Sequence, residues 1–230
     1  MRTGGSSAPI LPDACSDLIW QAGRGAFVAG PDTGPVPVTA GADAVFVGAR
    51  FRPGAGGAAL GLPLSELRDL RVDLADLDRA LAERLPADLE PREALRRVAE
   101  IALTAPSADT AIAEAARRLE QPQARVESLA GDLGLSERQL RRRCHAAAGY
   151  GPKTLQRVLR FRRFLAARNP DLARAALDAG YADQSHLTRE CTRLAGRTPA
   201  ALLRGLGAPR PWHSSHWPAA AHPPSRLTPP

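Results

Sequence analysis

Apolar residues recur at helical spacing through most of this chain, and at the shorter spacing of strands only near its beginning. In residues 126–133 and 172–179, apolar positions at i, i+3, i+4 and i+7 give each stretch one apolar face, as in an amphipathic helix. Residues 10–61 instead hold short apolar runs separated by Gly, Pro and Asp, which is typical of strands and turns. The pattern predicts a mainly α protein with a small β-rich N-terminal region, which we place at residues 1–75.

Four runs of the N-terminal region have the composition of strands: residues 16–20, 26–29, 36–38 and 44–51. Pro37, within the third run, favours an edge strand or an extended segment, because proline cannot donate to a strand ladder. Two interpretations of the larger side chains remain open, a ligand pocket and an ordinary core, and aromatic residues on strands more often form core. The side chains concerned are Trp20, Phe27, Phe46, Arg50 and Phe51.

Residues 76–120 form a predicted helical connector. Leucines recur at helical spacing between positions 74 and 85, apolar residues do so again between 95 and 102, and prolines separate these pieces. A further helix is expected over 107–119, with Ser107 as its cap. The connector either packs the two ends of the chain together or pairs with its equivalent in a homodimer, and internal packing is favoured.

The C-terminal half contains an internal repeat, which predicts two copies of a helix, a turn and a second helix. Equivalent residues lie 47 positions apart, and they include Leu140 and Leu187, Arg142 and Arg189, and Cys144 and Cys191. We place this domain at residues 121–206, with residues 121–124 as the linker that leads into it.

Each copy also has the residues that begin and end helices. Gly134 and Gly180 supply the permissive backbone needed just after the first helix of each copy. Ser136 and Asp183 are suited to cap the second helix, and Ser136 with Gln139 predicts a capping box. The repeat is therefore expected to be two helix-turn-helix units.

The second helix of each unit, at about 136–147 and 183–195, combines an apolar stripe with a polar outer face. The outer faces carry side chains that can bond base edges and phosphates: Arg138, Gln139, Arg141 and Arg142 in the first, and Gln184, Ser185, His186, Thr188 and Arg189 in the second. A helix fits the major groove of duplex DNA, with its N-terminal residues against the bases. A single helical corner of this kind is often only structural, but two copies in register favour DNA binding.

A long helix is expected between the two units, beginning at Pro152. Its apolar residues cover more than one face, which suits a helix between two lobes. Lys153 and Arg157 lie near its start, where they could reach phosphates. A last helix begins at Pro199, and the Pro-, Ala-, His- and Ser-rich residues 207–230 are expected to be disordered.

With these features in view, residues 125–204 resemble the double helix-turn-helix domain of AraC/XylS-type transcription regulators. The resemblance rests on "LAGDLGLSERQLRRRC", "GPKTLQRVLRFRRFLAAR", "AALDAGYADQSHLTREC" and "LAGRTPAALL". It implies two recognition helices that enter successive major grooves on one face of double-stranded DNA, with the outward side chains named above reading the bases. The chain departs from the family at Cys144 and Cys191, where a bulky aromatic residue is usual.

The stretches "LPDAC", "VAGP" and "VGARFRPG" also resemble an N-terminal module found before this type of domain. The resemblance implies a regulatory role of unknown input, through which a small-molecule effector could act. In arabinose-type regulators the N-terminal domain is a sugar-binding β-barrel, and the region here is short for a full barrel with a ligand cavity. RNA polymerase would be a further partner if the protein is an activator.

Charge supports a polyanionic ligand for the C-terminal half. The chain of 230 residues has a formal net charge of +7, and this charge is uneven. Residues 1–120 contain 13 basic and 17 acidic side chains, whereas residues 121–204 contain 16 basic and 7 acidic ones. Such a concentration of positive charge is the electrostatic signature of a nucleic-acid-binding domain. It would equally suit a non-specific nucleoid-associated protein, which is the alternative function.

Other functional classes find little support in the sequence. It contains no phosphate-binding glycine loop, no Gly-x-Ser-x-Gly elbow and no His-Glu-x-x-His motif, so we expect no enzyme, no cofactor and no metal site. Three widely separated cysteines fit a reduced, cytoplasmic protein. No targeting segment or apolar run of membrane-spanning length is evident, so no membrane partner is expected.

Overall fold

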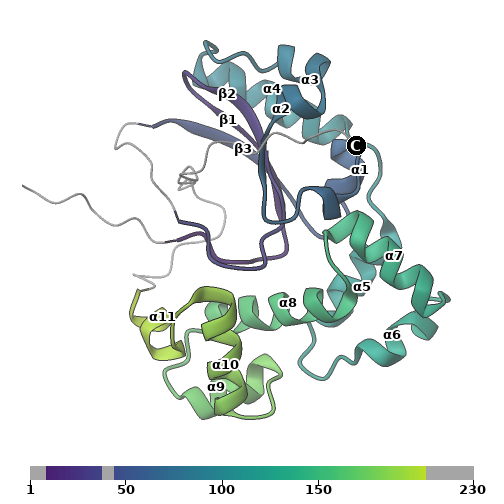
Figure 1. Ribbon diagram of the computed structural model, residues 1–230, viewed down its shortest axis with the longest axis vertical. Helices are drawn as coiled ribbons and strands as arrows, with labels where there is room; N and C mark the ends of the chain where they lie inside the picture. Colours follow the sequence, from purple (N-terminus) through teal and green to yellow (C-terminus); the bar gives the residue numbers. More distant parts are fainter. Residues whose placement is uncertain (1–8, 38–43, 206–230) are drawn as a thin grey trace, which may run out of the picture.

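A computed structural model of the protein describes residues 9–37 and 44–205 (Figure 1). Four antiparallel strands near the N-terminus form one sheet in the order β3-β1-β2-β4. The strands are β1 (Ser16–Gln21), β2 (Gly25–Ala29), β3 (Phe46–Phe51) and β4 (Arg71–Asp73). Three of the four predicted runs therefore form strands. The run at 36–38 contributes an isolated bridge from Val36 to Ile10; Val38, like the tail at 207–230, lies outside the described residues.

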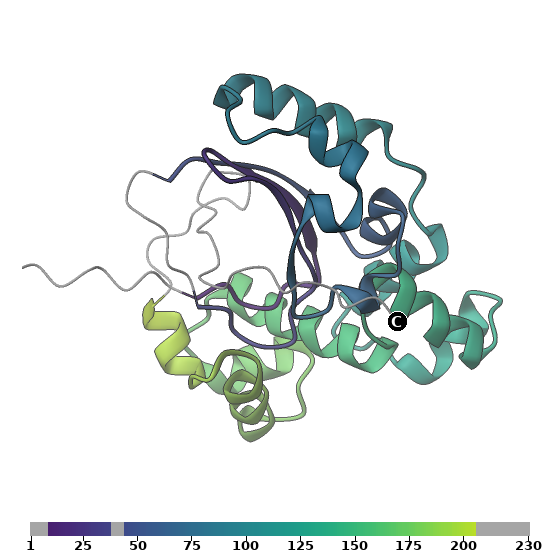
Figure 2. The ribbon, with the colours of Figure 1, turned by 45° about the horizontal axis from the view of Figure 1, so that its top comes forward.

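Short helices lie between β3 and β4 and after β4 in the sequence, and the longest helix of this region, Pro91–Thr104, covers one face of the sheet (Figures 1 and 2). They are α1 (Gly56–Leu60), the 3₁₀ helix η1 (Leu64–Glu66), α2 (Leu74–Leu77), α3 (Arg79–Glu83) and α4 (Pro91–Thr104). Helix α4 buries Ala94, Val98 and Ile101 in the same core as Leu18 and Trp20 of β1. The core interpretation of the aromatic side chains thus holds for Trp20, whose indole N–H donates to the Pro86 carbonyl at 2.7 Å.

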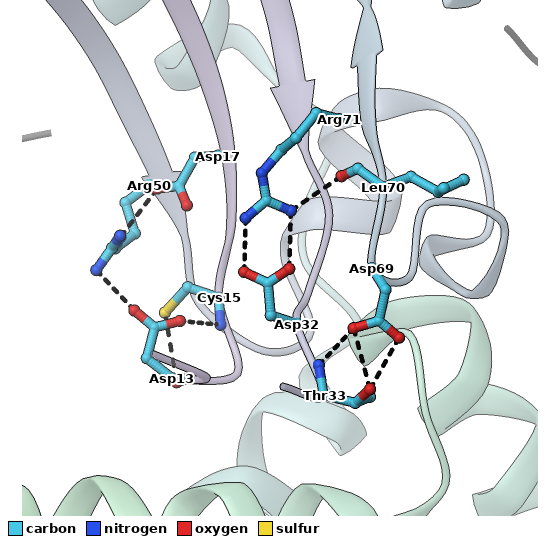
Figure 3. Close-up of polar contacts among 9 residues, drawn as sticks. All are labelled: Asp13, Cys15, Asp17, Asp32, Thr33, Arg50, Asp69, Leu70 and Arg71. Atoms are coloured by element: carbon cyan, nitrogen blue, oxygen red, sulfur yellow. Dashed lines mark hydrogen bonds and ion pairs between the residues drawn. The ribbon is translucent and has the colours of Figure 1, made fainter. Parts of the chain in front are cut away.

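The remaining strand aromatics also pack rather than converge on a cavity. Phe27 and Phe51 are buried, and Phe46 is half-buried beside Phe27. Arg50 is exposed and forms ion pairs with Asp13 and Asp17 (Figure 3). These side chains therefore hold the sheet together.

The leucine-spaced stretch between 74 and 85 forms two short helices instead of one. Asp78 adopts extended backbone between α2 and α3, and its carboxylate accepts a bond from the Leu81 amide at 2.9 Å. An aspartate in this conformation is a favourable helix cap, so it divides the stretch. Similarly, the helix expected over 107–119 begins after Asp109 and not after Ser107, because the Asp109 carboxylate accepts from the Ile112 amide.

Seven helices make up the described part of the C-terminal lobe. They are α5 (Thr110–Leu119), α6 (Val126–Asp132), α7 (Glu137–Ala148), α8 (Pro152–Ala167), α9 (Leu172–Ala179), α10 (Gln184–Ala195) and α11 (Pro199–Gly205). One apolar core joins them, with Phe161 and Phe164 of the central helix α8 fully buried in it. Helix α5, from the end of the expected connector, contributes Ile112 and Leu119 to this core.

The N-terminal region packs directly against α7. The Gly54 amide donates to the carbonyl of Ala147 in α7 at 3.1 Å. Gly149, which ends α7 with a φ of 83°, lies so close to Pro31 that an added Cβ would stand 2.3 Å from the proline ring. Only glycine fits both this left-handed conformation and this contact. The first helix-turn-helix unit is therefore held against the N-terminal region.

Within the described residues, no helix has the length and apolar character needed to cross a bilayer, and no cluster of three or more His, Cys, Asp or Glu side chains is placed to hold a metal ion.

Candidate nucleic-acid interface

Helices α7 and α10 are built in the same way and lie toward opposite ends of α8 (Figure 1). Ser136 accepts a hydrogen bond from the Gln139 amide, and the Gln139 side chain accepts one from the Ser136 amide, so the predicted capping box is present. Asp183 caps α10 by accepting from the His186 amide at 2.7 Å. Both helices end at a glycine in the left-handed conformation, Gly149 and Gly196. The repeat in sequence is thus a repeat in structure.

The two cysteines of the repeat point into the core. Cys144 and Cys191 are both fully buried, and burial raises the pKa of each thiol to about 12. A buried neutral thiol serves as a small apolar side chain. The position where related domains carry a bulky aromatic residue is therefore an inward-facing position of each recognition helix.

The predicted base-reading residues divide into free and engaged side chains. Seven are exposed: Arg138, Gln139, Arg141 and Arg142 in α7, and Gln184, Ser185 and Arg189 in α10. Gln139 is partly committed to its capping box. His186 and Thr188 are half-buried; the His186 ring packs edge-on against Tyr181 at 5.2 Å, and the Thr188 hydroxyl donates to the Gln184 carbonyl.

The two helix-turn-helix units differ in charge at one half-buried position of the recognition helix. Arg143 of α7 makes two hydrogen bonds to Asp109, at 2.6 and 2.8 Å, and so ties α7 to the start of α5. Its equivalent in α10 is Glu190, which pairs with Arg157 of α8 at 2.8 Å. Arg157, which was predicted to contact phosphates, is paired in the structure with this carboxylate, whose side chain is 13% exposed, and it also lines the groove described next.

A groove runs between the two units along the start of α8. Its charged lining residues are mainly cationic: Arg138, Arg141, Lys153, Arg157 and Arg193 from the helical lobe, with Glu127 and Glu137 as the acidic ones. Lys153 is 80% exposed and stands 4.0 Å from Glu127, so it is available to a ligand. The groove also includes Thr33 and Arg68 of the N-terminal region.

Three residues that line the groove, Arg193, His145 and Arg68, were missed from the sequence. Arg193 follows Arg189 by one helical turn, and this spacing was a usable signal. His145 likewise follows Arg141 by one turn; its pKa is lowered by burial and by the neighbouring Arg141 and Arg68. Arg68 lies on a turn, 69 positions before the first residue of α7, and had no periodic signal.

This geometry defines a class of protein: one that carries two capped, outward-facing recognition helices on one helical scaffold, which is a double helix-turn-helix DNA-binding domain. Residues 129–205 match a family described as a helix-turn-helix domain. The region is an AraC-type helix-turn-helix domain, and the protein is a DNA-binding transcription regulator. Residues 2–73 match a separate domain of unknown function (DUF6597).

Two solved structures of ToxT from Vibrio cholerae are similar to the chain over most of both lengths. The first has 10% sequence identity and a TM-score of 0.47, and covers 88% of this chain and 95% of ToxT. The second has 10% identity and a TM-score of 0.45, with coverage of 90% and 97%. No curated protein matches the sequence. The assignment rests on the helix-turn-helix match and on the repeated geometry.

Proposed function

We propose that the protein is a sequence-specific, cytoplasmic transcription regulator that inserts α7 and α10 into two successive major grooves of one DNA duplex. The observation that supports this most is the repeated recognition helix. Two capped helices on one scaffold present arginine at the same outward position, Arg142 and Arg189. Phosphate contacts alone carry no sequence information, whereas arginine can bond two acceptors of a guanine edge.

Arg142 and Arg189 are the proposed principal base readers. Both are exposed, and neither forms an ion pair with any described residue. We propose that Arg138, Arg141, Gln184, Ser185, His186 and Thr188 supply the remaining base-edge and phosphate contacts. Loss of either principal arginine is expected to cost about 1–3 kcal/mol of binding free energy and to relax sequence preference in one half of the site.

The test is binding of the full chain to the upstream region of its own gene, against a scrambled duplex of equal length, across a salt series. We expect the specific duplex to bind at least ~10³-fold more tightly at ~150 mM salt. Equal affinity for both duplexes, falling together as salt rises, would favour the alternative of a non-specific nucleoid-associated protein.

The principal arginines are tested by Arg142→Ala and Arg189→Ala on that duplex and on versions mutated in either half. Each variant should lose discrimination in one half only. Arg92→Ala is the matched control, since Arg92 is an exposed arginine at the start of α4, which packs on the sheet. Equal losses on specific and scrambled DNA would refute base reading by these arginines.

We propose that the N-terminal region regulates DNA binding. We also propose that the protein acts by binding DNA and catalyses no reaction. The contacts of Gly54 and Pro31 with the end of α7 give such a signal a direct route to the first recognition helix. The partners of this regulation would be a small-molecule effector, a second copy of the chain in a homodimer, or RNA polymerase in the case of an activator.

A further inference from the structure

One turn of the N-terminal region presents an arginine beside the first recognition helix. The turn comprises residues 67–70, directly after η1, and is closed by a hydrogen bond from the Leu70 amide to the Leu67 carbonyl at 3.0 Å. Asp69 adopts a left-handed backbone conformation with a φ of 60°. Its amide donates to the Pro31 carbonyl at 3.1 Å, and its carboxylate accepts from both the amide and the hydroxyl of Thr33 (Figure 3).

The residues that flank Arg68 in this turn are fixed in place. Leu67 is fully buried, and its carbonyl lies against Gly30, where an added Cβ would come within 1.7 Å. Arg71 makes a buried two-bond ion pair with Asp32, with both distances 2.7 Å (Figure 3). Arg68 itself is exposed. The turn is thus a rigid support for one outward guanidinium group.

The same support is packed against α7. Helix η1 contacts α7, and Gly149 at the end of α7 lies against both Pro31 and the Leu64 carbonyl. As a result Arg68 lines the groove that Arg138, Arg141 and His145 also line.

The cations on this side of the groove lack protein counter-ions. Neither Arg68 nor Arg141 has an ion pair among the described residues. The carboxylate nearest to Arg68 in sequence, Asp69, is occupied by Thr33. Positive groups placed side by side repel one another unless an anion lies between them. This arrangement therefore favours an anionic ligand that spans Arg68 and α7.

We propose that Arg68 contacts a phosphate of the DNA bound by α7, so that the N-terminal region forms part of the DNA-binding surface. The inference rests on the proposed function. Arg68 stands beside the C-terminal part of α7, whereas the N-terminal part of a recognition helix meets the bases. It therefore reaches the sugar–phosphate backbone at the edge of the groove and adds affinity without sequence preference. Because the turn is already rigid, little conformational entropy is lost on contact.

The test uses the full chain with Arg68→Ala, Arg68→Lys and the control Arg92→Ala. Affinity is measured on the upstream and scrambled duplexes across a salt series. For Arg68→Ala, we expect roughly three- to tenfold weaker binding to both duplexes, and a slope of log affinity against log salt that is smaller by about 0.9. Arg68→Lys keeps the charge and should restore the slope, and Arg92→Ala should behave as wild type.

Thermal unfolding of each variant checks the fold, and it should not change because Arg68 is exposed. An Arg68→Ala variant with the affinity and salt slope of wild type overturns the inference, as does one that matches Arg92→Ala. That result leaves the proposed function intact if wild type still prefers the upstream duplex. Failure of wild type to discriminate between the duplexes overturns the proposed function instead, and the change of slope on scrambled DNA then still decides whether Arg68 touches phosphate.

Discussion

The ion pair between Arg157 and Glu190 makes it possible to test whether Arg157 stabilises the fold or contacts a DNA phosphate. Arg157 of α8 is 29% exposed and Glu190 of α10 is 13% exposed, with 2.8 Å between the paired atoms. Arg157→Ala would leave a largely buried carboxylate without its cation. Breaking a fully buried pair from one side costs about 3–5 kcal/mol. Water can partly solvate the carboxylate at this exposure, so we expect a loss of about 1–3 kcal/mol of unfolding free energy.

The assay is urea unfolding of wild type, Arg157→Ala, Glu190→Gln and the double variant, with the DNA salt series run in parallel. If the pair is structural, the double variant loses less stability than the two single losses added together, because the two sites are coupled. If Arg157 instead contacts a phosphate, stability stays unchanged and the salt slope falls by about 0.9. Unchanged stability of Arg157→Ala together with that lower slope would refute the structural reasoning.

Three further predictions follow from single positions. Lys153→Ala, at an exposed groove residue, should weaken binding to all duplexes alike and lower the salt slope by about 0.9 without changing urea unfolding; a sequence-dependent loss would contradict this role. Gly149→Ala should lower the unfolding free energy by about 1–3 kcal/mol, through backbone strain and collision with Pro31. The equivalent Gly196→Ala, with φ 63° and open space around it, should cost only the strain, so equal losses would argue against the Pro31 contact. Burial raises the pKa of Asp17 from 3.8 to about 7, against the lowering effect of Arg50. The stability it contributes is therefore complete below pH 3.8 and is lost as the pH rises through about 7. Asp17→Asn should flatten unfolding free energy over that range, and an unaltered pH profile would contradict the shift.

The helix-turn-helix units were predictable because their signals are local. A helix cap, a glycine after each helix and an apolar stripe are all spaced within a few residues, and the 47-residue repeat supplied each of these signals twice. Local sequence could not decide whether Ser107 or Asp109 caps α5. Both residue types cap helices, and Arg143, 34 residues away, bonds the carboxylate that does so.

The contacts between elements that are distant in sequence could not be predicted from spacing. The approach of Pro31 to Gly149 and the pairing of Arg157 with Glu190 depend on how separate elements pack, which no periodicity encodes. Strand β4 was missed because three residues are too short to display alternation. Arg68 was missed for a related reason, since a lone arginine on a turn is unremarkable until the turn is seen against α7.

The opposite charges at Arg143 and Glu190 make the duplication unequal in its mechanical connections. Through these two ion pairs the first unit is attached to the start of α5 and the second to α8, and the first unit also contacts the N-terminal region. A displacement of the N-terminal region would therefore act on α7 directly and on α10 only through the contacts of α8. DNA bending measured at saturating protein would report such a displacement directly.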